Sequence, residues 1–181
     1  MSQRNIFVDG EWGLRQVDDY GILSSFDCGD EDLNEYFRED AILHKQELIT
    51  QTYCFFHETD NGAWPLALMD LCNDAVKLKD LDDDIDISRK KRYPFLPAVK
   101  ITRFGVIKEL QGDNLGSHAL NLIKKFFLTN NRTGCRFITV DAYNRPAVLS
   151  FYLKNGFIPF NDKDKDRHTR ALFFDLKRFS G

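Results

Sequence analysis

The spacing of apolar residues early in the chain predicts a helix. Between positions 31 and 43, apolar side chains return every three or four residues, which is typical of an amphipathic helix of about four turns. The repeating residues are Leu33, Tyr36, Phe37, Ala41 and Leu43. Residues 26–33 indicate a strand end that gives way to this helix, with Asp27 and Asp30 as candidate N-cap residues.

A hairpin is expected after this helix. Residues 49–57 are rich in β-branched and aromatic side chains, and residues 64–72 form a second apolar run. Asn61-Gly62 lies between the two runs, and both residue types tolerate the positive φ angles that a tight turn requires. The two runs are therefore expected to pair as antiparallel strands.

Strands and helices alternate in the second half of the chain. We expect strands at 98–107, 136–140 and 171–176, and helices at 116–128 and 145–154. The inner face of the first of these helices carries Leu120, Ile123, Phe126 and Phe127, and Asn155-Gly156 ends the second. This alternation indicates a mixed sheet with helices packed on its faces.

The segment 73–97 interrupts the pattern with two blocks of charge. The acidic block holds Asp80, Asp82, Asp83, Asp84 and Asp86, and the basic block holds Arg89, Lys90, Lys91 and Arg92. Charge runs are usually solvated, so we expect a long surface loop that could contact a substrate. We find no internal repeat.

Composition narrows the class of protein. The chain has 181 residues, 43% hydrophobic and 29% charged, which indicates a single globular domain, 1–181, rather than a disordered chain. Sixteen phenylalanines predict an aromatic core, and a net charge of −3 argues against a broad nucleic-acid-binding surface. The four scattered cysteines indicate buried free thiols rather than a metal site or a redox dithiol. With no signal-like or membrane-spanning stretch, we expect a cytoplasmic protein.

The turn at residues 111–116 is a candidate anion site. It joins a predicted strand to a predicted helix, where unpaired N–H groups and the positive end of the helix dipole attract negative charge. Gly112 and Gly116 allow a ligand close to the backbone, and Ser117 can add a donor. The turn ends in no Gly-Lys-Ser/Thr and lacks the three-glycine dinucleotide pattern. A tight connection without a ligand is the alternative.

Three motifs resemble those of the GNAT family of acetyl-CoA-dependent N-acetyltransferases. Gln111 and Gly116 match the first and last positions of the family's pyrophosphate loop, and Asn114, which enters the left-handed region readily, stands where the family has its middle glycine. Downstream, Asn144-Arg145-Pro146-Ala147 and residues 151–157 are similar to the family's Asn-x-x-Ala and Phe-Tyr-x-x-x-Gly-Phe. Residues 26–34 look like the start of a subgroup that includes toxin-type acetyltransferases. The resemblance runs from about Tyr20 to Leu176 and is weakest at 73–93.

The resemblance implies a fold and a cofactor site. The fold is an α/β (α+β) one: a GNAT-like mixed, mostly antiparallel central sheet with helices on both faces and a splayed parallel strand pair. Acetyl-CoA is the implied acyl-donor cosubstrate, and its pantetheine arm would bond the strand at 102–107. The implied cofactor-binding residues are Phe104, Gly105, Val106, Gln111, Gly112, Asp113, Asn114, Leu115, Gly116, Ser117, Asn144 and Ala147. Gly105 replaces a common alanine, which should widen the slot for the arm.

The resemblance also implies two catalytic groups. An amide near Val106 would polarise the thioester carbonyl, and Tyr152 aligns with the family's general acid. A phenol with a pKa of about 10 stays protonated at neutral pH and can donate to a leaving thiolate. Tyr143 is the nearest competitor, and a buried structural tyrosine is the alternative reading.

No residue is assigned as the base or as a triad member. Asp70, Asp141 and Glu109 are candidate bases by their strand positions, although acidic residues near strand ends are usually solvated. His118 lies where it could touch a phosphate. His44, His57 and His168 lie in no pattern that indicates metal or triad chemistry.

The expected function is transfer of an acetyl group from acetyl-CoA to a primary amine by direct attack in a ternary complex. One alternative is a toxin-type enzyme acting on aminoacyl-tRNA, for which residues 89–92 and 163–170 are the dense basic stretches. The other is a non-catalytic module that binds acyl-CoA or a protein. The expected acceptor is a small molecule or a peptide amine, with no membrane partner, and the chain would be a monomer or homodimer.

Overall fold

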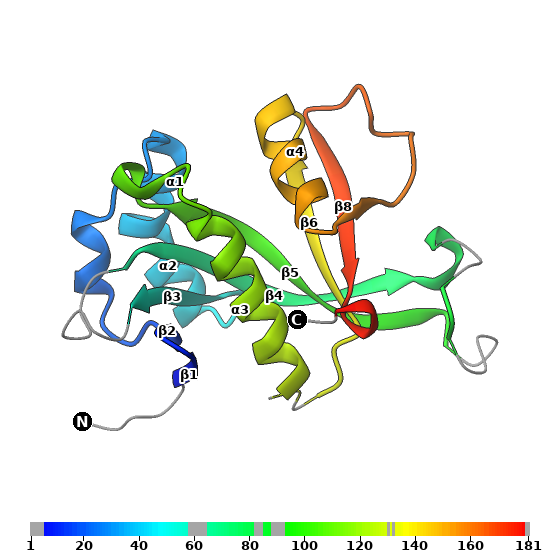
Figure 1. The fold of residues 1–181 in the computed structure, drawn as a ribbon, viewed down its shortest axis with the longest axis horizontal. Coiled ribbons are helices and arrows are strands. Elements are labelled where there is room, and N and C mark those ends of the chain that lie inside the picture. Colours follow the sequence, from blue (N-terminus) through cyan, green and yellow to red (C-terminus); the bar gives the residue numbers. More distant parts are fainter. Residues whose placement is uncertain are drawn as a thin grey trace. The chain divides into compact units, whose positions relative to one another are not determined.

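The structure is a computed structural model that describes residues 6–57, 65–81, 85–87, 93–129, 131 and 133–179. Its mostly antiparallel eight-stranded sheet has the order β1-β2-β3-β4-β5-β6-β8-β7 (Figure 1). The strands are β1 (Ile6–Asp9), β2 (Trp12–Gln16), β3 (Gln51–His57), β4 (Ala67–Lys77), β5 (Phe95–Val106), β6 (Phe137–Tyr143), β7 (Ile158–Pro159) and β8 (Thr169–Asp175). The helices are α1 (Glu31–Glu35), α2 (Ala41–Gln46), α3 (Leu115–Thr129) and α4 (Pro146–Lys154).

Contacts divide the chain into two compact units. Unit 1 holds Met1–Cys72 and Thr102–Phe126, and unit 2 holds Asn73–Ile101 and Phe127–Gly181. The strands β4 and β5 each contribute to both units. The single domain expected from length stays a prediction.

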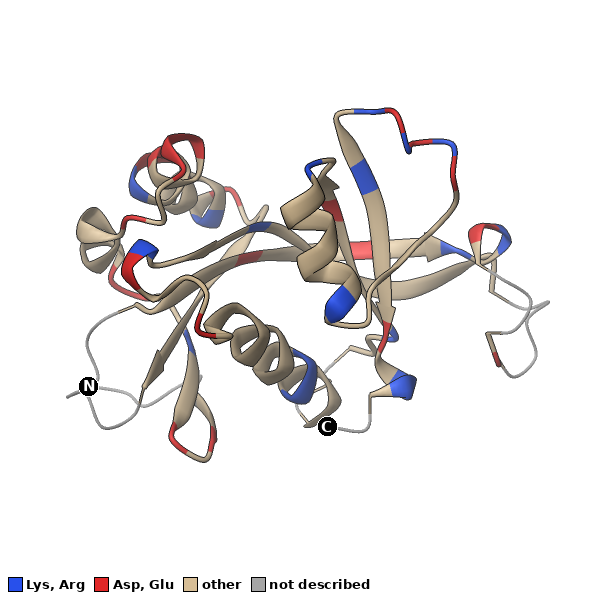
Figure 2. Cartoon of the chain, turned by 45° about the horizontal axis from the view of Figure 1, so that its top comes forward, with Lys and Arg blue, Asp and Glu red and all other residues tan. Residues whose placement is uncertain are grey.

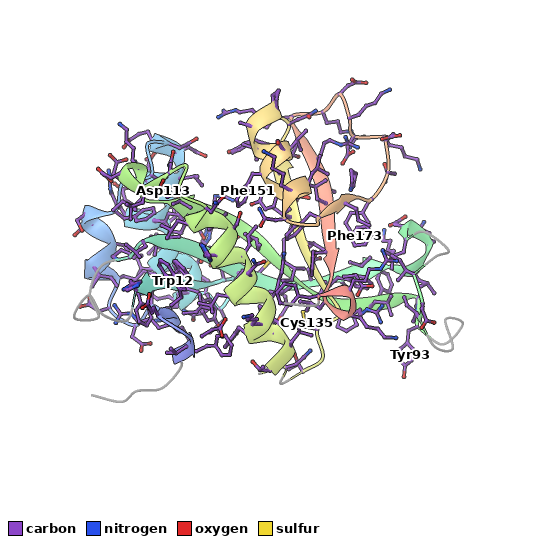
Figure 3. All side chains as sticks on the ribbon, viewed as in Figure 1. Trp12, Tyr93, Asp113, Cys135, Phe151 and Phe173 are labelled. Carbon is purple, nitrogen blue, oxygen red and sulfur yellow. The ribbon has the colours of Figure 1, made fainter. Side chains whose placement is uncertain are left out.

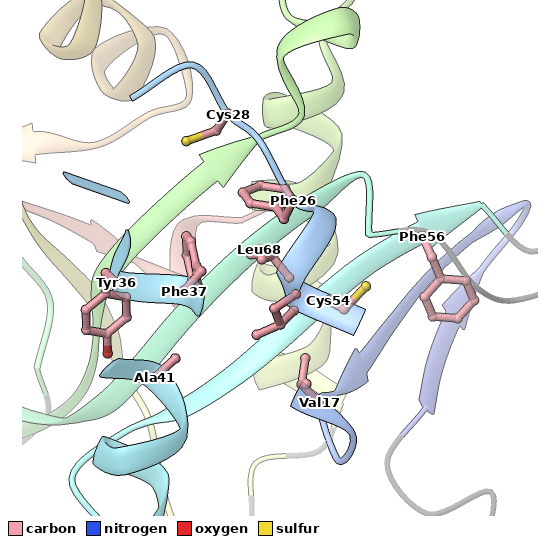
Figure 4. Close-up of a cluster of buried hydrophobic side chains, with 10 residues drawn as sticks. Val17, Phe26, Cys28, Tyr36, Phe37, Ala41, Cys54, Phe56 and Leu68 are labelled. Atoms are coloured by element: carbon pink, nitrogen blue, oxygen red, sulfur yellow. The ribbon is translucent and has the colours of Figure 1, made fainter. Parts of the chain in front are cut away.

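The core of unit 1 lies between β3 and the helical segment that follows residue 30. Alternate residues of β3 point to opposite faces, so Cys54 and Phe56 join the helix-side cluster while Tyr53 packs near Phe126 of α3. Figure 4 shows this cluster: Val17, Leu23, Phe26, Cys28, Tyr36, Phe37, Ala41, Cys54, Phe56 and Leu68. Helices therefore cover both faces of the sheet in this unit, as predicted.

The predicted early helix is confirmed, with an irregularity. Asp30 is the N-cap, since its carboxylate accepts a hydrogen bond from the Leu33 amide at 3.3 Å. The helix then passes through a π-helical turn, Tyr36–Asp40, before continuing as α2. The expected strand end at Phe26 is wrong, because Phe26 caps a 3₁₀ helix, Tyr20–Ser25, instead.

The expected hairpin of residues 49–57 and 64–72 is confirmed, since β3 and β4 pair antiparallel with Thr52 opposite Asp70. The Asn61-Gly62 turn lies outside the described residues. Another hairpin was not predicted: β1 pairs with β2 from Ile6↔Arg15 to Asp9↔Trp12, with Gly10 at φ +63° in the turn. On β2, a Cβ at Gly13 would lie 2.2 Å from the Phe56 ring, so a glycine is required there.

In unit 2, β5 and β6 form the predicted parallel pair. Their register runs from Ala98↔Phe137 to Ile101↔Val140, while β5 continues to Val106 and β6 to Tyr143. The strand β8 pairs antiparallel with both β6 and the short β7, which was not predicted.

The expected surface loop at 73–97 is wrong in three places. The strand β4 extends to Lys77, a 3₁₀ turn occupies Leu78–Asp80, and β5 begins at Phe95. Val76, Ile85 and Leu96 are buried with Phe137 and Phe173. Apolar residues scattered among charges therefore supply part of this core, although the charges hide them in the sequence. The basic block 89–92 lies outside the described residues.

Two further findings concern thiols and membranes. The cysteines are free; Cys28 and Cys54 are buried, and Cys72 and Cys135 are partly buried. Among the described residues no group of histidines, cysteines and carboxylates could hold a metal ion. Of the helices that the structure describes, none combines the length and apolar character needed to cross a bilayer.

Candidate functional site

The loop after β5 is braced by the Gln111 side chain. Its amide nitrogen donates to the Cys28 carbonyl at 2.7 Å and to the Val106 carbonyl at 3.0 Å. The backbone adds a contact, since the Lys108 amide donates to the Asp27 carbonyl at 2.9 Å. Gln111 therefore ties the end of β5 to the segment before α1, which is a structural role within the predicted site.

The loop has the backbone conformation that the sequence predicts. Gly112 lies at φ +97° and Asn114 at φ +60°, so the asparagine occupies the left-handed region. The carbonyl of Asn114 accepts from the His118 amide at 3.0 Å and closes the first turn of α3. Residues 111–114 are exposed, whereas Leu115 is buried and can offer only its backbone to a ligand. Figure 3 shows Asp113 at the start of α3.

The first turn of α3 follows this loop, with Gly116 and Ser117 partly buried. The first amides of an α-helix have no carbonyl one turn earlier to accept them, and the helix dipole leaves this end positive. α3 runs from Leu115 to Thr129, so the dipole is that of a full-length helix. Unit 1 thus presents the geometry of an anion site.

A segment that the sequence did not mark as part of the site supports this loop. Asn34 of α1 is only 2% exposed, and its side-chain oxygen accepts from the Cys28 amide at 2.9 Å. Its side-chain nitrogen donates to Asp27 at 2.7 Å. The hydrogen bond from the Gly29 amide, and after it the one from Asn34, lower the pKa of the Asp27 carboxyl. These bonds fix the Cys28 carbonyl that Gln111 uses. An asparagine at a buried helix position was the available signal.

Gly105 does not act as predicted. A Cβ there would lie 3.2 Å from both Cys28 and Phe26, within the helix-side core. The glycine therefore permits close packing of residues 26–28 on β5, which corrects the expectation that it widens a cofactor slot. Phe104 and Val106 are partly buried on the same strand.

In unit 2, Tyr152 lies buried on α4. Its ring packs edge-on against Phe151 at 5.2 Å and Phe157 at 5.3 Å between centroids. Burial raises the pKa of Tyr152 well above that of a free phenol, so the hydroxyl is protonated at neutral pH. No hydrogen-bond partner of that hydroxyl lies in the part of the chain that the structure describes. A buried phenol in this state can donate to a ligand.

The remaining motif residues of unit 2 differ in what they contact. The Asn144 side-chain nitrogen donates to the carbonyls of Lys165 at 2.5 Å and Arg167 at 2.9 Å, so it holds the loop before β8. Ala147 is exposed in the first turn of α4. The competitor Tyr143 packs edge-on against the His168 ring at 5.2 Å.

The candidate bases lie in unlike surroundings. Asp70 is fully buried and accepts hydrogen bonds from three hydroxyl groups, those of Tyr36, Thr52 and Thr102. Asp141 forms an ion pair with Lys100, and Glu109 is exposed in a 3₁₀ turn. Asp70 is therefore poorly placed to take a proton directly from a substrate.

His118 is exposed on α3, and its ring joins an aromatic stack. Its ring stacks on Trp12 at 5.5 Å, and Trp12 in turn stacks on Phe55 at 5.0 Å. An open pocket of about 410 Å³ lies beside this stack, lined by Trp12, His57, Leu66, Leu110, Asp113, Leu115 and His118. The stack fixes β2 to the start of α3.

The basic stretch at 163–170 is not a positive surface. Charges of both signs alternate along the loop between β7 and β8 (Figure 2). Arg170 pairs with Asp162 at 3.2 Å and with Asp164 at 3.5 Å. This stretch is therefore largely self-neutralised and gives little support to a contact with RNA.

Comparison with known proteins defines the class of fold. No protein-family model matches the sequence. Solved structures with the same fold include bacterial toxins, and the match confirms the predicted GNAT-like fold.

Three of these structures match over nearly the whole chain. AtaT complexed with acetyl-methionyl-tRNAfMet is 26% identical, with a TM-score of 0.68 over 92% of this chain and 95% of that one. A tyrosine-to-phenylalanine mutant of KacT is 20% identical, with a TM-score of 0.73 over 92% and 96%. A similar mutant of the AtaT toxin, bound to the C-terminus of the antitoxin AtaR and acetyl-CoA, is 23% identical, with a TM-score of 0.64 over 92% and 94%.

Proposed function

We propose that this protein is an acetyl-CoA-dependent N-acetyltransferase that acetylates a primary amine in a ternary complex. The observation that carries the proposal is the loop before α3, where Gly112 and Asn114 adopt the left-handed conformation that exposes helix-start amides to an anion. The solved AtaT structure with acetyl-CoA, which has this fold, supports the choice of cosubstrate. The formed loop also argues against a decayed, non-catalytic module.

The proposed roles of the site residues follow the resemblance of their motifs to those of the GNAT family. In unit 1, the backbone of Phe104, Gly105 and Val106 would bond the pantetheine arm, and the amides of residues 112–117 would bind the diphosphate: Gly112, Asp113, Asn114, Leu115, Gly116 and Ser117. Gln111 holds this loop in shape. In unit 2, Asn144 and Ala147 are the proposed further contacts, with Asn144 free to offer only its side-chain oxygen, since its nitrogen bonds the loop before β8.

The reaction needs one proton donor and an acceptor amine in its neutral form. The amine nitrogen attacks the thioester carbon, the C–N bond forms and the C–S bond breaks, while an amide near Val106 stabilises the oxyanion. Tyr152 then protonates the departing thiolate, the ammonium proton passes to water, and water returns a proton to the Tyr152 phenolate. The KacT and AtaT structures that carry a tyrosine-to-phenylalanine change support the choice of a tyrosine as the proton donor.

The second candidate is narrower: the amine is the α-amine of an aminoacyl-tRNA. The structure of AtaT with acetyl-methionyl-tRNAfMet favours it. An α-amine with a pKa of about 7.7 is about one-sixth neutral at pH 7, whereas a lysine amine at about 10.4 is almost wholly protonated. A site with no direct base therefore suits an α-amine better.

Calorimetric titration with acetyl-CoA tests the proposal, with Gly116→Pro as the comparison variant. Proline is tolerated in the first helical turn, so the variant should fold while losing one amide donor. We expect micromolar binding to the natural chain and at least a tenfold loss in the variant. Absence of binding to the natural chain would contradict the proposal, and unchanged binding by the variant would remove Gly116 from the site.

A further inference from the structure

A buried carboxylate lies at the centre of a polar cluster in unit 1. Asp70 is fully buried on β4, in an otherwise apolar run. Its Oδ1 accepts from the Thr52 hydroxyl at 2.8 Å, and its Oδ2 accepts from Thr102 at 3.2 Å and from the Tyr36 hydroxyl. Burying a carboxylate is costly unless it is hydrogen-bonded. The three hydroxyl donors therefore have to hold fixed positions around Asp70.

The cluster fixes the ring of Tyr36. The Tyr36 hydroxyl donates to Asp70, and His44 Nδ1 lies 3.1 Å from the Tyr36 hydroxyl oxygen. Burial and the bond to Asp70 raise the pKa of Tyr36, so the phenol remains a donor at any physiological pH. Tyr36 also begins the π-helical turn, a feature that often marks functional positions.

The guanidinium of Arg103 packs over the Tyr36 ring. Its central carbon lies 4.7 Å from the ring centroid, and one nitrogen donates to the Thr102 carbonyl at 2.9 Å. Arg103 is partly buried, and within the described ranges no carboxylate lies within ion-pair distance of it. A guanidinium has five N–H donors, so most of them are available for an anion. A half-desolvated cation left unpaired favours binding of a ligand anion.

We propose that Arg103 binds a phosphate of an RNA acceptor and that Asp70 positions it through Tyr36. The inference rests on the proposed acetyltransferase function and names its acceptor class. Arg103 directly precedes Phe104 on β5, whereas the loop assigned to the cofactor diphosphate follows the other end of that segment, at residues 111–116. With the pantetheine arm on residues 104–106 and the diphosphate at 111–116, as proposed above, Arg103 would lie at the acetyl end of the cosubstrate, close to an acceptor.

The test compares Arg103→Gln with a matched control, Arg15→Gln. Arg15 lies in the same unit with its guanidinium 5.2 Å from the Phe56 ring, so its loss removes the same charge and the same kind of contact. The acceptors are aminoacyl-tRNA charged with the twenty amino acids, and the corresponding amino acid methyl esters. Initial rates are measured at several salt concentrations, with calorimetric titration of acetyl-CoA beside them.

For Arg103→Gln we expect the KM for aminoacyl-tRNA to rise about tenfold, with unchanged acetyl-CoA affinity and unchanged rates on methyl esters. The slope of log(1/KM) against log salt should fall by about 1, since one phosphate contact is lost. Arg103→Lys should restore the slope but only part of the KM. Tyr36→Phe keeps the ring under Arg103 but loses the hydrogen bond to Asp70. It should raise the KM about threefold and leave the salt slope unchanged.

An unchanged KM and salt slope in Arg103→Gln, or an equal effect in Arg15→Gln, would overturn the role of Arg103 and leave acetyl transfer standing. Methyl esters that serve the natural chain as well as aminoacyl-tRNA would overturn phosphate recognition in the same way. If the natural chain binds no acetyl-CoA, the proposed function and this inference both fail. A changed acetyl-CoA affinity in Arg103→Gln would assign the arginine to the cofactor instead.

Discussion

Tyr152 differs from most buried tyrosines because its hydroxyl has no partner in the described part of the chain. Among the described residues, its hydroxyl oxygen is not one of the enclosed side-chain atoms that lack a partner, so the tip of this otherwise buried side chain is accessible. A ligand can therefore supply the missing hydrogen bond. Burial of the rest of the side chain raises the pKa of Tyr152, which keeps its hydroxyl protonated at neutral pH.

Tyr152→Phe should therefore separate catalysis from folding. We expect kcat to fall by about 10²–10⁴, since the proton donor is lost. The midpoint of thermal unfolding and the acetyl-CoA affinity should stay nearly unchanged, because no hydrogen bond within the described chain is removed. Steady-state kinetics and calorimetry measure these quantities, with Tyr143→Phe as the control. Unchanged turnover would make Tyr152 a core residue.

Asn114 offers a test of backbone conformation at a single position. With φ at +60°, Asn114→Gly should bind acetyl-CoA within about twofold of the natural chain, since glycine adopts this region freely. Asn114→Val should weaken binding at least tenfold, because a β-branched residue is strained there. Titration calorimetry gives both affinities, and circular dichroism checks that α3 remains. Equal affinities would mean that the loop does not contact the cosubstrate.

Residue type alone predicted part of the candidate site. The rest depends on contacts between residues that are distant in the sequence. The left-handed conformation of Asn114 follows from its type and its place before a helix. The bond from Gln111 to Cys28 joins residues 83 positions apart, so no local pattern contains it. The residues that a Cβ at Gly105 would contact were unpredictable for the same reason, because residues 26–28 are distant in sequence.

At the scale of elements, α3 contains a lysine where its buried face requires an apolar residue. Lys124 is only 2% exposed, and burial lowers its pKa to about 8. An unfolded lysine has a pKa of about 10.4. Between these values the unfolded chain binds more protons, so stability rises with pH; below about pH 8 the full cost of burying the charge is present.

Lys124→Met should relieve that cost. We expect the variant to be more stable by about 1–3 kcal/mol at pH 7, with the gain shrinking toward zero as the pH approaches about 10.4. Urea unfolding at pH 7 and pH 9.5 measures the effect, and Lys154→Met, at an exposed position of α4, is the control. A gain independent of pH would mean that methionine merely packs better than lysine.

Strong periodicity predicted elements well, and weak periodicity did not. The helix at 31–43, the β3–β4 hairpin and the strands around α3 and α4 are confirmed because each buries a regular face. The β1–β2 hairpin was missed since Gly10 and Gly13 break the alternation, and the need for Gly13 appears only when Phe56 is packed on it. The end of β4 was missed because the polar residues Asn73, Asp74 and Lys77 interrupt its apolar run.

At the scale of the molecule, charge constrains the partner. A net charge of −3 and the paired charges before β8 leave no broad positive surface on the described residues. RNA association then depends on local cations, and its rate should be modest and sensitive to salt. This favours a few placed contacts, such as the one proposed for Arg103, over a basic stripe.

The two units should unfold as one. Neither is a continuous stretch of chain, since the backbone passes from one to the other after Cys72, Ile101 and Phe126, and β4 and β5 have residues in both. A unit that unfolded alone would unpair half of each strand and expose its backbone amides. We therefore expect a single calorimetric transition, with equal calorimetric and van't Hoff enthalpies.

Acetyl-CoA at one hundred times its dissociation constant should shift that single transition upward, with a stabilisation of about 2.7 kcal/mol. Near-ultraviolet circular dichroism, far-ultraviolet circular dichroism and calorimetry should give the same midpoint with and without the ligand. Two transitions, of which acetyl-CoA moves only one, would show separate domains. The cofactor loop and Tyr152 would then belong to parts of the chain that fold independently, and the prediction of a single domain would be wrong.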